Sequence, residues 1–111
     1  MKKDPRVFLI HILENAALAQ VNLEDFDFDR FIKNKAIQDA VVREIEIIGE
    51  ATKNLPLEFK DRHPEIPWQK IAGMRNKIVH NYFDIDFKVV WDTVKEDLPK
   101  LEKQIKKLVK S

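Results

Sequence analysis

Apolar side chains recur at steps of three and four residues along most of the chain, and no stretch shows the alternation of a half-buried strand. The first such stretch predicts a helix over residues 5–21. Asp4 is a suitable N-cap, Pro5 suits the first helical position, and His11 is expected to be a partly buried packing residue. The apolar positions of this helix are Phe8, Leu9, Ile12, Leu13, Ala16 and Ala17.

Three aspartates alternate with aromatic residues in the next segment, residues 22–30. Asp25, Asp27 and Asp29 could suggest a calcium loop, but such a loop also needs a central glycine and a closing glutamate. Phenylalanines stand at the two intervening positions instead. We therefore predict a turn whose aromatic side chains close one end of a bundle.

A longer stretch predicts a helix over residues 35–54 with a wide apolar face. Gly49 in its interior costs about 1 kcal/mol relative to alanine, which suggests that another element packs closely there. Glu46 and Glu50 share one face, and both are expected to be solvated unless one of them pairs with a basic segment. The apolar face comprises Ile37, Val41, Ile45, Ile48, Thr52 and Leu55.

Prolines divide the rest of the chain. Three of the five fall between residues 55 and 67, which predicts a connector with at most a short helix over residues 57–62. A further helix is predicted to begin at Pro67. A last helical region starts near residue 86, with a kink or a restart near Asp97 because of a proline two residues later.

These elements predict an all-α bundle of four or five helices, with residues 1–111 forming one domain. The chain has no cysteine, which excludes disulfides and thiolate sites and fits a cytoplasmic location. Apolar runs such as residues 7–10 are too short to span a membrane. The two glycines form no phosphate-binding loop, and the single serine is the terminal Ser111, which argues against an NTPase and a serine triad.

Charge is nearly balanced, with a formal net charge of +1, so any contact with nucleic acid has to be local. Residues 1–55 carry 8 Lys and Arg against 10 acids, whereas residues 56–111 carry 12 against 9. The second half also contains the segment best suited to chemistry, residues 66–86. No acid lies between Ile66 and Phe83, and the candidate site residues there are Arg75, Asn76 and His80 for catalysis, Lys70 and Lys77 for substrate binding, and Tyr82.

On a helical wheel with about 100° per residue, Met74 and Ile78 fall on the side of Ile71, which is expected to face the core. The opposite side presents Gly73, Asn76 and His80.

Arg75 and His80 would project about 140° apart on a continuous helix, so they could not easily grip one atom. Either the helix ends near His80, or a second copy completes the site. We favour a homodimer that packs this segment on its two-fold axis.

The spacing of Arg75, His80 and Tyr82, with four residues and then one between them, resembles the signature of the HEPN superfamily, specifically its HepT-like branch. Three stretches are similar to that branch: IGEATKNLP at residues 48–56, IPWQKIAGMRNKIVHNYFDID at 66–86 and VWDTVKEDLPKL at 90–101. They stand in the same order and cover most of the chain.

The resemblance implies a homodimeric endoribonuclease that uses neither a metal nor another cofactor. It further implies the toxin of a type II or type VII-like toxin-antitoxin pair, neutralised by a minimal nucleotidyltransferase antitoxin that attaches AMP to Tyr82.

The residues permit this chemistry independently, because RNA carries its own nucleophile, the 2′ hydroxyl. His80 would move protons, Arg75 would stabilise charge on the phosphate, and Asn76 would orient one of the reacting groups. The alternative is a non-catalytic HEPN module that binds a nucleotidyltransferase or a nucleotide through the same basic cleft.

Overall fold

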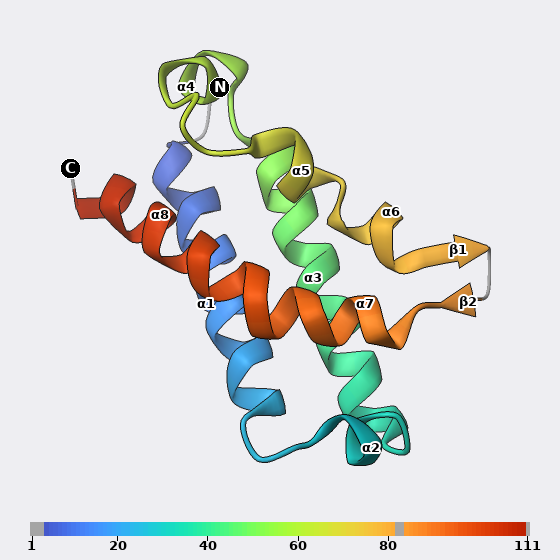
Figure 1. Cartoon of the computed structure of the whole chain (residues 1–111). Coiled ribbons are helices and arrows are strands. Elements are labelled where there is room, and N and C mark those ends of the chain that lie inside the picture. The colour runs from blue at the N-terminus through green and yellow to red at the C-terminus, as the bar shows by residue number, and fades with distance from the viewer. Residues whose placement is uncertain (1–3, 82–83, 111) are drawn as a thin grey trace.

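The computed structural model describes residues 4–81 and 84–110, with only the backbone of His80 and Asn81 included (Figure 1). Its elements in chain order are α1 (Pro5–Leu23), α2 (Phe28–Phe31), α3 (Lys35–Asn54), α4 (Leu57–Arg62), α5 (Trp68–Ala72), α6 (Met74–Ile78), β1 (Val79–Asn81), β2 (Asp84–Ile85), α7 (Phe87–Asp92), the π-helical turn η1 (Thr93–Asp97) and α8 (Leu98–Lys110). The predicted all-α class is confirmed. None of the described helices is both long and apolar enough to cross a bilayer.

Helices α1 and α3 pack side by side, and α7, η1 and α8 cross in front of them as one long rod (Figure 1). Together with Phe31 of α2, their facing side chains form a single hydrophobic cluster whose largest fully buried members include Leu9, Ile12, Ile45, Ile48, Leu98 and Ile105. A polar contact also joins α1 to α3, since the Asn22 amide donates to both carboxylate oxygens of Glu44 at 3.0 Å. Partial burial raises the pKa of Glu44, and the Asn22 hydrogen bond acts in the opposite direction.

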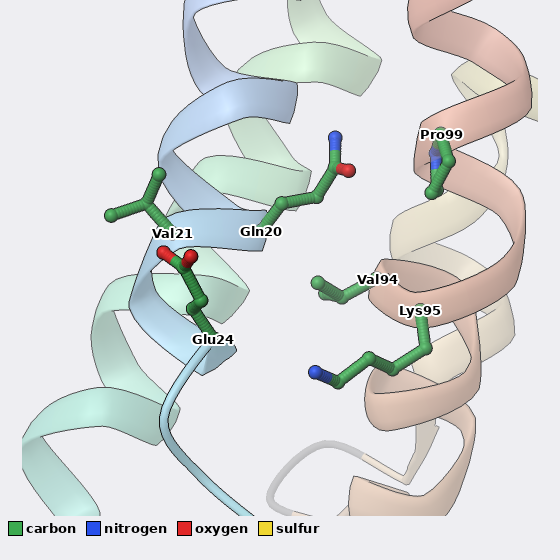
Figure 2. Close-up of a pocket in the computed structure, with 6 residues that line it drawn as sticks. All are labelled: Gln20, Val21, Glu24, Val94, Lys95 and Pro99. Atoms are coloured by element: carbon green, nitrogen blue, oxygen red, sulfur yellow. The ribbon is translucent and has the colours of Figure 1, made fainter.

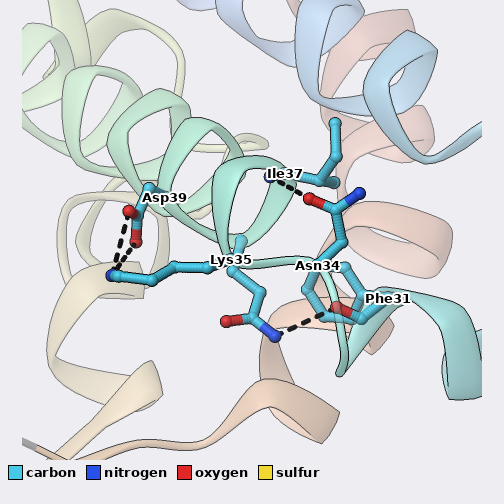
Figure 3. A network of polar contacts seen from close by, with 6 residues as sticks. Phe31, Asn34, Lys35, Ile37 and Asp39 are labelled. Carbon is cyan, nitrogen blue, oxygen red and sulfur yellow. Dashed lines mark hydrogen bonds and ion pairs between the residues drawn. The ribbon is translucent and has the colours of Figure 1, made fainter.

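Side-chain caps fix where the main helices begin. The Asp4 carboxylate accepts from the Arg6 amide at 2.9 Å, as predicted for the start of α1. At the start of α3, the Asn34 side chain accepts from the Ile37 amide at 3.0 Å (Figure 3). His11 lies exposed on α1, so the prediction of a partly buried residue there was wrong.

The segment between α1 and α3 closes one end of the bundle with aromatic rings. Phe28, from the predicted turn, lies 5.8 Å from Trp91, but it begins helix α2, and the central ring is that of Phe31, one residue beyond the predicted range. Phe31 is fully buried, and its ring centroid lies 5.6 Å from that of Trp91 and 6.0 Å from that of Phe87. Asp27 caps α2 by accepting from the Arg30 amide at 2.8 Å, which gives this aspartate a structural role.

A widened turn precedes Pro99, and α8 begins at Leu98, so the helix restarts next to Asp97 as predicted. The amide of Leu98 donates to the Thr93 carbonyl, five residues back, which defines the π-helical turn just before the proline. A wider turn relieves the clash between a proline ring and the carbonyl four residues earlier, which here belongs to Lys95. The Lys95 ammonium group crosses to α1 and donates to the Leu23 carbonyl at 3.2 Å, beside a groove of about 370 Å³ (Figure 2).

Two departures from the predicted fold lie in the segment with the candidate site residues. The predicted helix from Pro67 is broken at Gly73 into α5 and α6, and it ends at Ile78. The chain then forms a short antiparallel pair of strands, β1 and β2, where no strand was predicted. A three-residue strand is too short to show an alternating pattern in the sequence.

Candidate active site

The segment that holds the predicted site residues is fastened to the bundle by its apolar side chains. Trp68, at the start of α5, is buried, and its indole nitrogen donates to the carbonyls of Lys60 at 3.1 Å and His63 at 3.0 Å. Ile71, Met74 and Ile78 are also buried, as the helical wheel predicted. The segment therefore has a fixed inner face, and its polar residues are held on the outside.

Gly49 on α3 allows the backbone of α5 to approach closely. A Cβ atom at this position would lie 3.3 Å from the carbonyl oxygen of Ala72, which is tighter than most such contacts. The predicted close packing at Gly49 is therefore confirmed, and the element that packs there is the end of α5. This contact sets the distance between α3 and the beginning of α6.

Gly73 forms the joint between the two short helices. Its amide donates to the Gln69 carbonyl at 3.0 Å, and a Cβ atom there would lie 3.2 Å from the same oxygen. Gly73 thus lies at a turn between two helices. The prediction had placed it on the outer side of one continuous helix. Asn76 does lie on the outer face, where it is exposed together with Arg75 and Lys77.

Arg75 is positioned by a carboxylate from α3. Its Nε donates to Glu46 Oε2 at 3.0 Å, and the two side chains are 57% and 44% exposed. Within the described part of the chain, no other acceptor bonds to this guanidinium group. One of its edges is therefore fixed by Glu46, which leaves the terminal nitrogens as candidates for a ligand such as a phosphate oxygen.

The two lysines predicted to bind substrate lie on either side of this region. Lys77 Nζ is 4.0 Å from Asp97 Oδ2, at the limit of an ion pair. Lys70 is exposed and lines a groove of about 760 Å³ together with Lys53 and Lys60. The same lysine also borders a smaller groove of about 190 Å³ beside α8. The additional lysines of these grooves were not among the predicted site residues.

His80 lies on β1, two residues beyond the end of α6, and its side chain is outside the described part of the structure. Tyr82 lies outside the described residues altogether. The backbone around His80 is anchored, because Val79 pairs with Ile85 and the Asp86 amide donates to the Ile78 carbonyl at 2.8 Å. Since the helix ends at Ile78, the angle of about 140° expected for a continuous helix does not apply to Arg75 and His80.

The partner of Arg75 was partly predictable from the sequence. Glu46 and Glu50 were both candidates for pairing with the basic segment, and only the packing of α6 against α3 selects Glu46. Asp97 was not considered as a partner for Lys77, because the two residues lie on elements separated by the strand pair. Among the described residues, no group of three or more His, Asp or Glu is arranged to hold a metal ion.

Comparison with known proteins finds one matching family model and several similar proteins that are named as ribonucleases. The model of the family described as "Ribonuclease HepT-like" matches residues 12–108. A "Probable ribonuclease HepT" of Thermococcus cleftensis is 46% identical over 110 residues, which are 99% of this chain and 100% of that protein. A "Putative RNase" of Caldanaerobacter subterraneus subsp. tengcongensis is 42% identical over 107 residues, 96% of each chain.

A longer relative from Methanocaldococcus jannaschii, named "Gamma-glutamylcyclotransferase and putative RNase", is 45% identical over 109 residues, 98% of this chain but 49% of that protein. No solved structure matches the chain at a comparable level of significance. The family match covers most of the chain and includes the segment with Arg75, His80 and Tyr82. The chain belongs to the HepT-like ribonuclease family of the HEPN superfamily.

Proposed function

We propose that the protein is an endoribonuclease that cleaves RNA without a metal ion, with Arg75, Asn76 and His80 as its catalytic residues. The observation that carries the proposal is the Arg75, His80 and Tyr82 spacing within a chain that belongs to a ribonuclease family. The exposed Arg75 guanidinium, held by one edge on Glu46, provides additional support.

The reaction is a transesterification at phosphorus within the RNA strand. The 2′ oxygen of a ribose forms a bond to the adjacent phosphorus, and the bond from phosphorus to the 5′ oxygen of the next nucleotide breaks. The 2′ hydroxyl loses a proton and the leaving 5′ oxygen gains one; His80 carries out one of these transfers, and water or the second His80 of the dimer carries out the other. The products are a cyclic phosphate and a free 5′ hydroxyl, and DNA is inert because it lacks the nucleophile.

Arg75 stabilises the charge that builds up on the phosphate oxygens in the transition state. Asn76 follows Arg75 on the exposed face of α6 and orients the imidazole or a phosphate oxygen. Lys70 and Lys77 bind neighbouring phosphates of the RNA. In our proposal two copies of the chain associate through residues 66–86, which we call the Arg75 segment. Both copies then contribute an arginine and a histidine to one cleft.

We further propose that the protein is the toxin of a toxin-antitoxin pair. Its partner is a minimal nucleotidyltransferase that transfers AMP from ATP to the Tyr82 hydroxyl, with pyrophosphate as the leaving group. The new phosphate would place negative charge beside Arg75 and His80 and compete with the RNA phosphate.

Cleavage of a labelled RNA in EDTA tests the enzymatic proposal. His80→Ala and Arg75→Ala are each expected to lower the rate by at least about 100-fold, a typical loss for an acid-base or charge-stabilising group. His11→Ala and Arg6→Ala, at exposed positions on α1, are the matched controls and should cleave normally.

Activity that disappears in EDTA and returns with magnesium would contradict the metal-independent mechanism. RNA binding without cleavage by the unmodified protein would instead favour the alternative, a binding module.

A further inference from the structure

Helix α1 carries a row of large apolar side chains that the described residues leave largely exposed. Val7, Ile10, Leu18 and Val21 are 42%, 43%, 51% and 62% exposed. Among the described residues, the other large apolar side chains with comparable exposure are those of Ile32 and Leu57, on other elements. We call the four residues on α1 the outer stripe.

The outer stripe lies directly opposite the face by which α1 joins the bundle. At about 100° per residue, its four members fall within an arc of about 80°. The centre of this arc is about 180° from the centre of the buried face, which comprises Leu9, Ile12, Ala16, Ala19 and Leu23. A helix that is apolar on two opposite faces is normally covered on both.

The spacing of the stripe is symmetric about Glu14. Val7 and Val21 lie seven residues before and after it, and Ile10 and Leu18 lie four residues before and after it. A two-fold axis at Glu14 therefore places Val7 against the Val21 of an antiparallel second copy, and Ile10 against its Leu18. An isologous interface requires this kind of self-complementary patch.

The charges beside the stripe have the same symmetry. Arg6 and Glu24 are 18 residues apart, which is five full helical turns, so they project on the same flank, about 80° from the centre of the stripe. They lie eight and ten residues from Glu14. The two-fold axis thus brings Arg6 of one copy beside Glu24 of the other, and does so twice. Opposite charges at the rim favour this pairing over others.

We propose that the outer stripe of α1 is an interface with a second copy of this chain, packed antiparallel about Glu14. This interface depends on the fold alone and not on the proposed ribonuclease activity. It is also separate from the Arg75 segment, because α1 packs on α3 and α8, whereas α6 and β1 lie on the far side of α3 (Figure 1). Val21 borders the groove between α1 and η1, and Figure 2 shows the end of its side chain pointing away from η1.

Glu14 limits the strength of this interface. The axis brings two exposed carboxylates together at the centre of the contact, and like charges there oppose association. The interface is therefore reversible, and Glu14→Gln is expected to tighten it.

Disulfide cross-linking tests both the interface and its register. The sequence has no cysteine, so every disulfide must join introduced cysteines. Val7→Cys and Val21→Cys should each remain uncross-linked alone, because the two identical positions would be about 21 Å apart along the paired helices. An equimolar mixture should form a disulfide between the two variants under mild oxidation. Leu57→Cys, mixed with either variant, is the control for random collision. A mixture of Val7→Cys and Val21→Cys that cross-links no faster than this control would overturn the proposal.

Light scattering over a range of concentrations gives the second test. Ile10→Asp and Leu18→Asp should remove one two-fold association step, and circular dichroism should show unchanged helix content because both side chains are exposed. Ile32→Asp and Leu57→Asp are matched controls and should keep the mass of the unmodified protein. Equal masses for all five proteins at every concentration would show that the stripe is covered by something other than a second copy, or by nothing, and would refute the interface.

Discussion

Arg75 has one partner within the protein, Glu46, and in our proposal it has a second in the RNA phosphate. Its bond to Glu46 joins exposed groups, so it contributes no more than about 1 kcal/mol to folding. The same bond removes much of the rotational freedom of a long side chain, and this is valuable where a guanidinium group must meet a phosphate. Glu46 is thus better explained as a residue that positions Arg75 than as a source of stability.

The first prediction concerns Glu46. Glu46→Ala should lower kcat for RNA cleavage by about 10-fold, because Arg75 loses the contact that orients it, whereas Glu46→Gln keeps an acceptor and should lose less. Glu50→Ala removes an exposed carboxylate one turn later on α3 and serves as the control. A Glu46→Ala protein that cleaves faster than the unmodified one would mean that Glu46 competes with RNA for Arg75.

Single residues also determined how well the sequence could be interpreted. Asp4 and Asn34 cap their helices through bonds that span two or three residues, so local rules can recognise them. The partner of Arg75 lies 29 residues away in sequence, and its identity depends on how two helices pack. The sequence could suggest Glu46 and Glu50, but it could not choose between them.

At the scale of elements, helix bounds followed from periodicity wherever a helix is long or is bracketed by prolines. The predicted ranges 35–54 and 57–62 agree with α3 and α4. The prediction failed between Pro67 and Asp86, because two five-residue helices joined at Gly73 have the same apolar spacing as one longer helix. The strand pair that follows is a local hairpin, but its strands of three and two residues are too short to show an alternating pattern in the sequence.

The second prediction concerns the contact between α3 and α5. Gly49→Leu should force the Ala72 carbonyl away from α3 and lower the free energy of unfolding by about 1 to 3 kcal/mol, as overpacking does. Urea denaturation measures the loss. Glu50→Leu places the same side chain at the adjacent exposed position and should change stability little. Equal stabilities for the two variants would show that α5 does not depend on this close approach.

At the scale of the whole molecule, the fold class and the core were predictable because apolar side chains recur at helical spacing along every long helix. How copies of the chain associate was harder to predict from the sequence. The prediction of a homodimer at the Arg75 segment came from a continuous helix that the structure does not contain, although the resemblance to the HepT-like branch implies a dimer independently. The outer stripe of α1 had a weak signal in the sequence, since Val7, Ile10, Leu18 and Val21 fall outside the inward face of that helix.

The third prediction concerns the whole protein with its proposed partner. After co-expression with a nucleotidyltransferase and ATP, intact mass spectrometry should show additions in steps of one AMP, and peptide mapping should locate them at Tyr82. Tyr82→Phe should still cleave RNA but should no longer be silenced. Silencing of Tyr82→Phe by nucleotide transfer to another residue would contradict the assignment.

The Arg75 segment is attached to α3 at two points, Gly49 beneath α5 and Glu46 beside α6. These points are three residues apart on one rigid helix, so their spacing along the axis is fixed at about 4.5 Å. The segment thus inherits its position along α3 from the helix beneath it. The connector over residues 55–67 holds only its beginning, because Trp68 donates to the carbonyls of Lys60 and His63. Insertions or deletions at the exposed start of α4, before Lys60, would change the outline of the molecule while leaving Arg75 where it is. Chain length can therefore vary in this part of the protein without altering the candidate site.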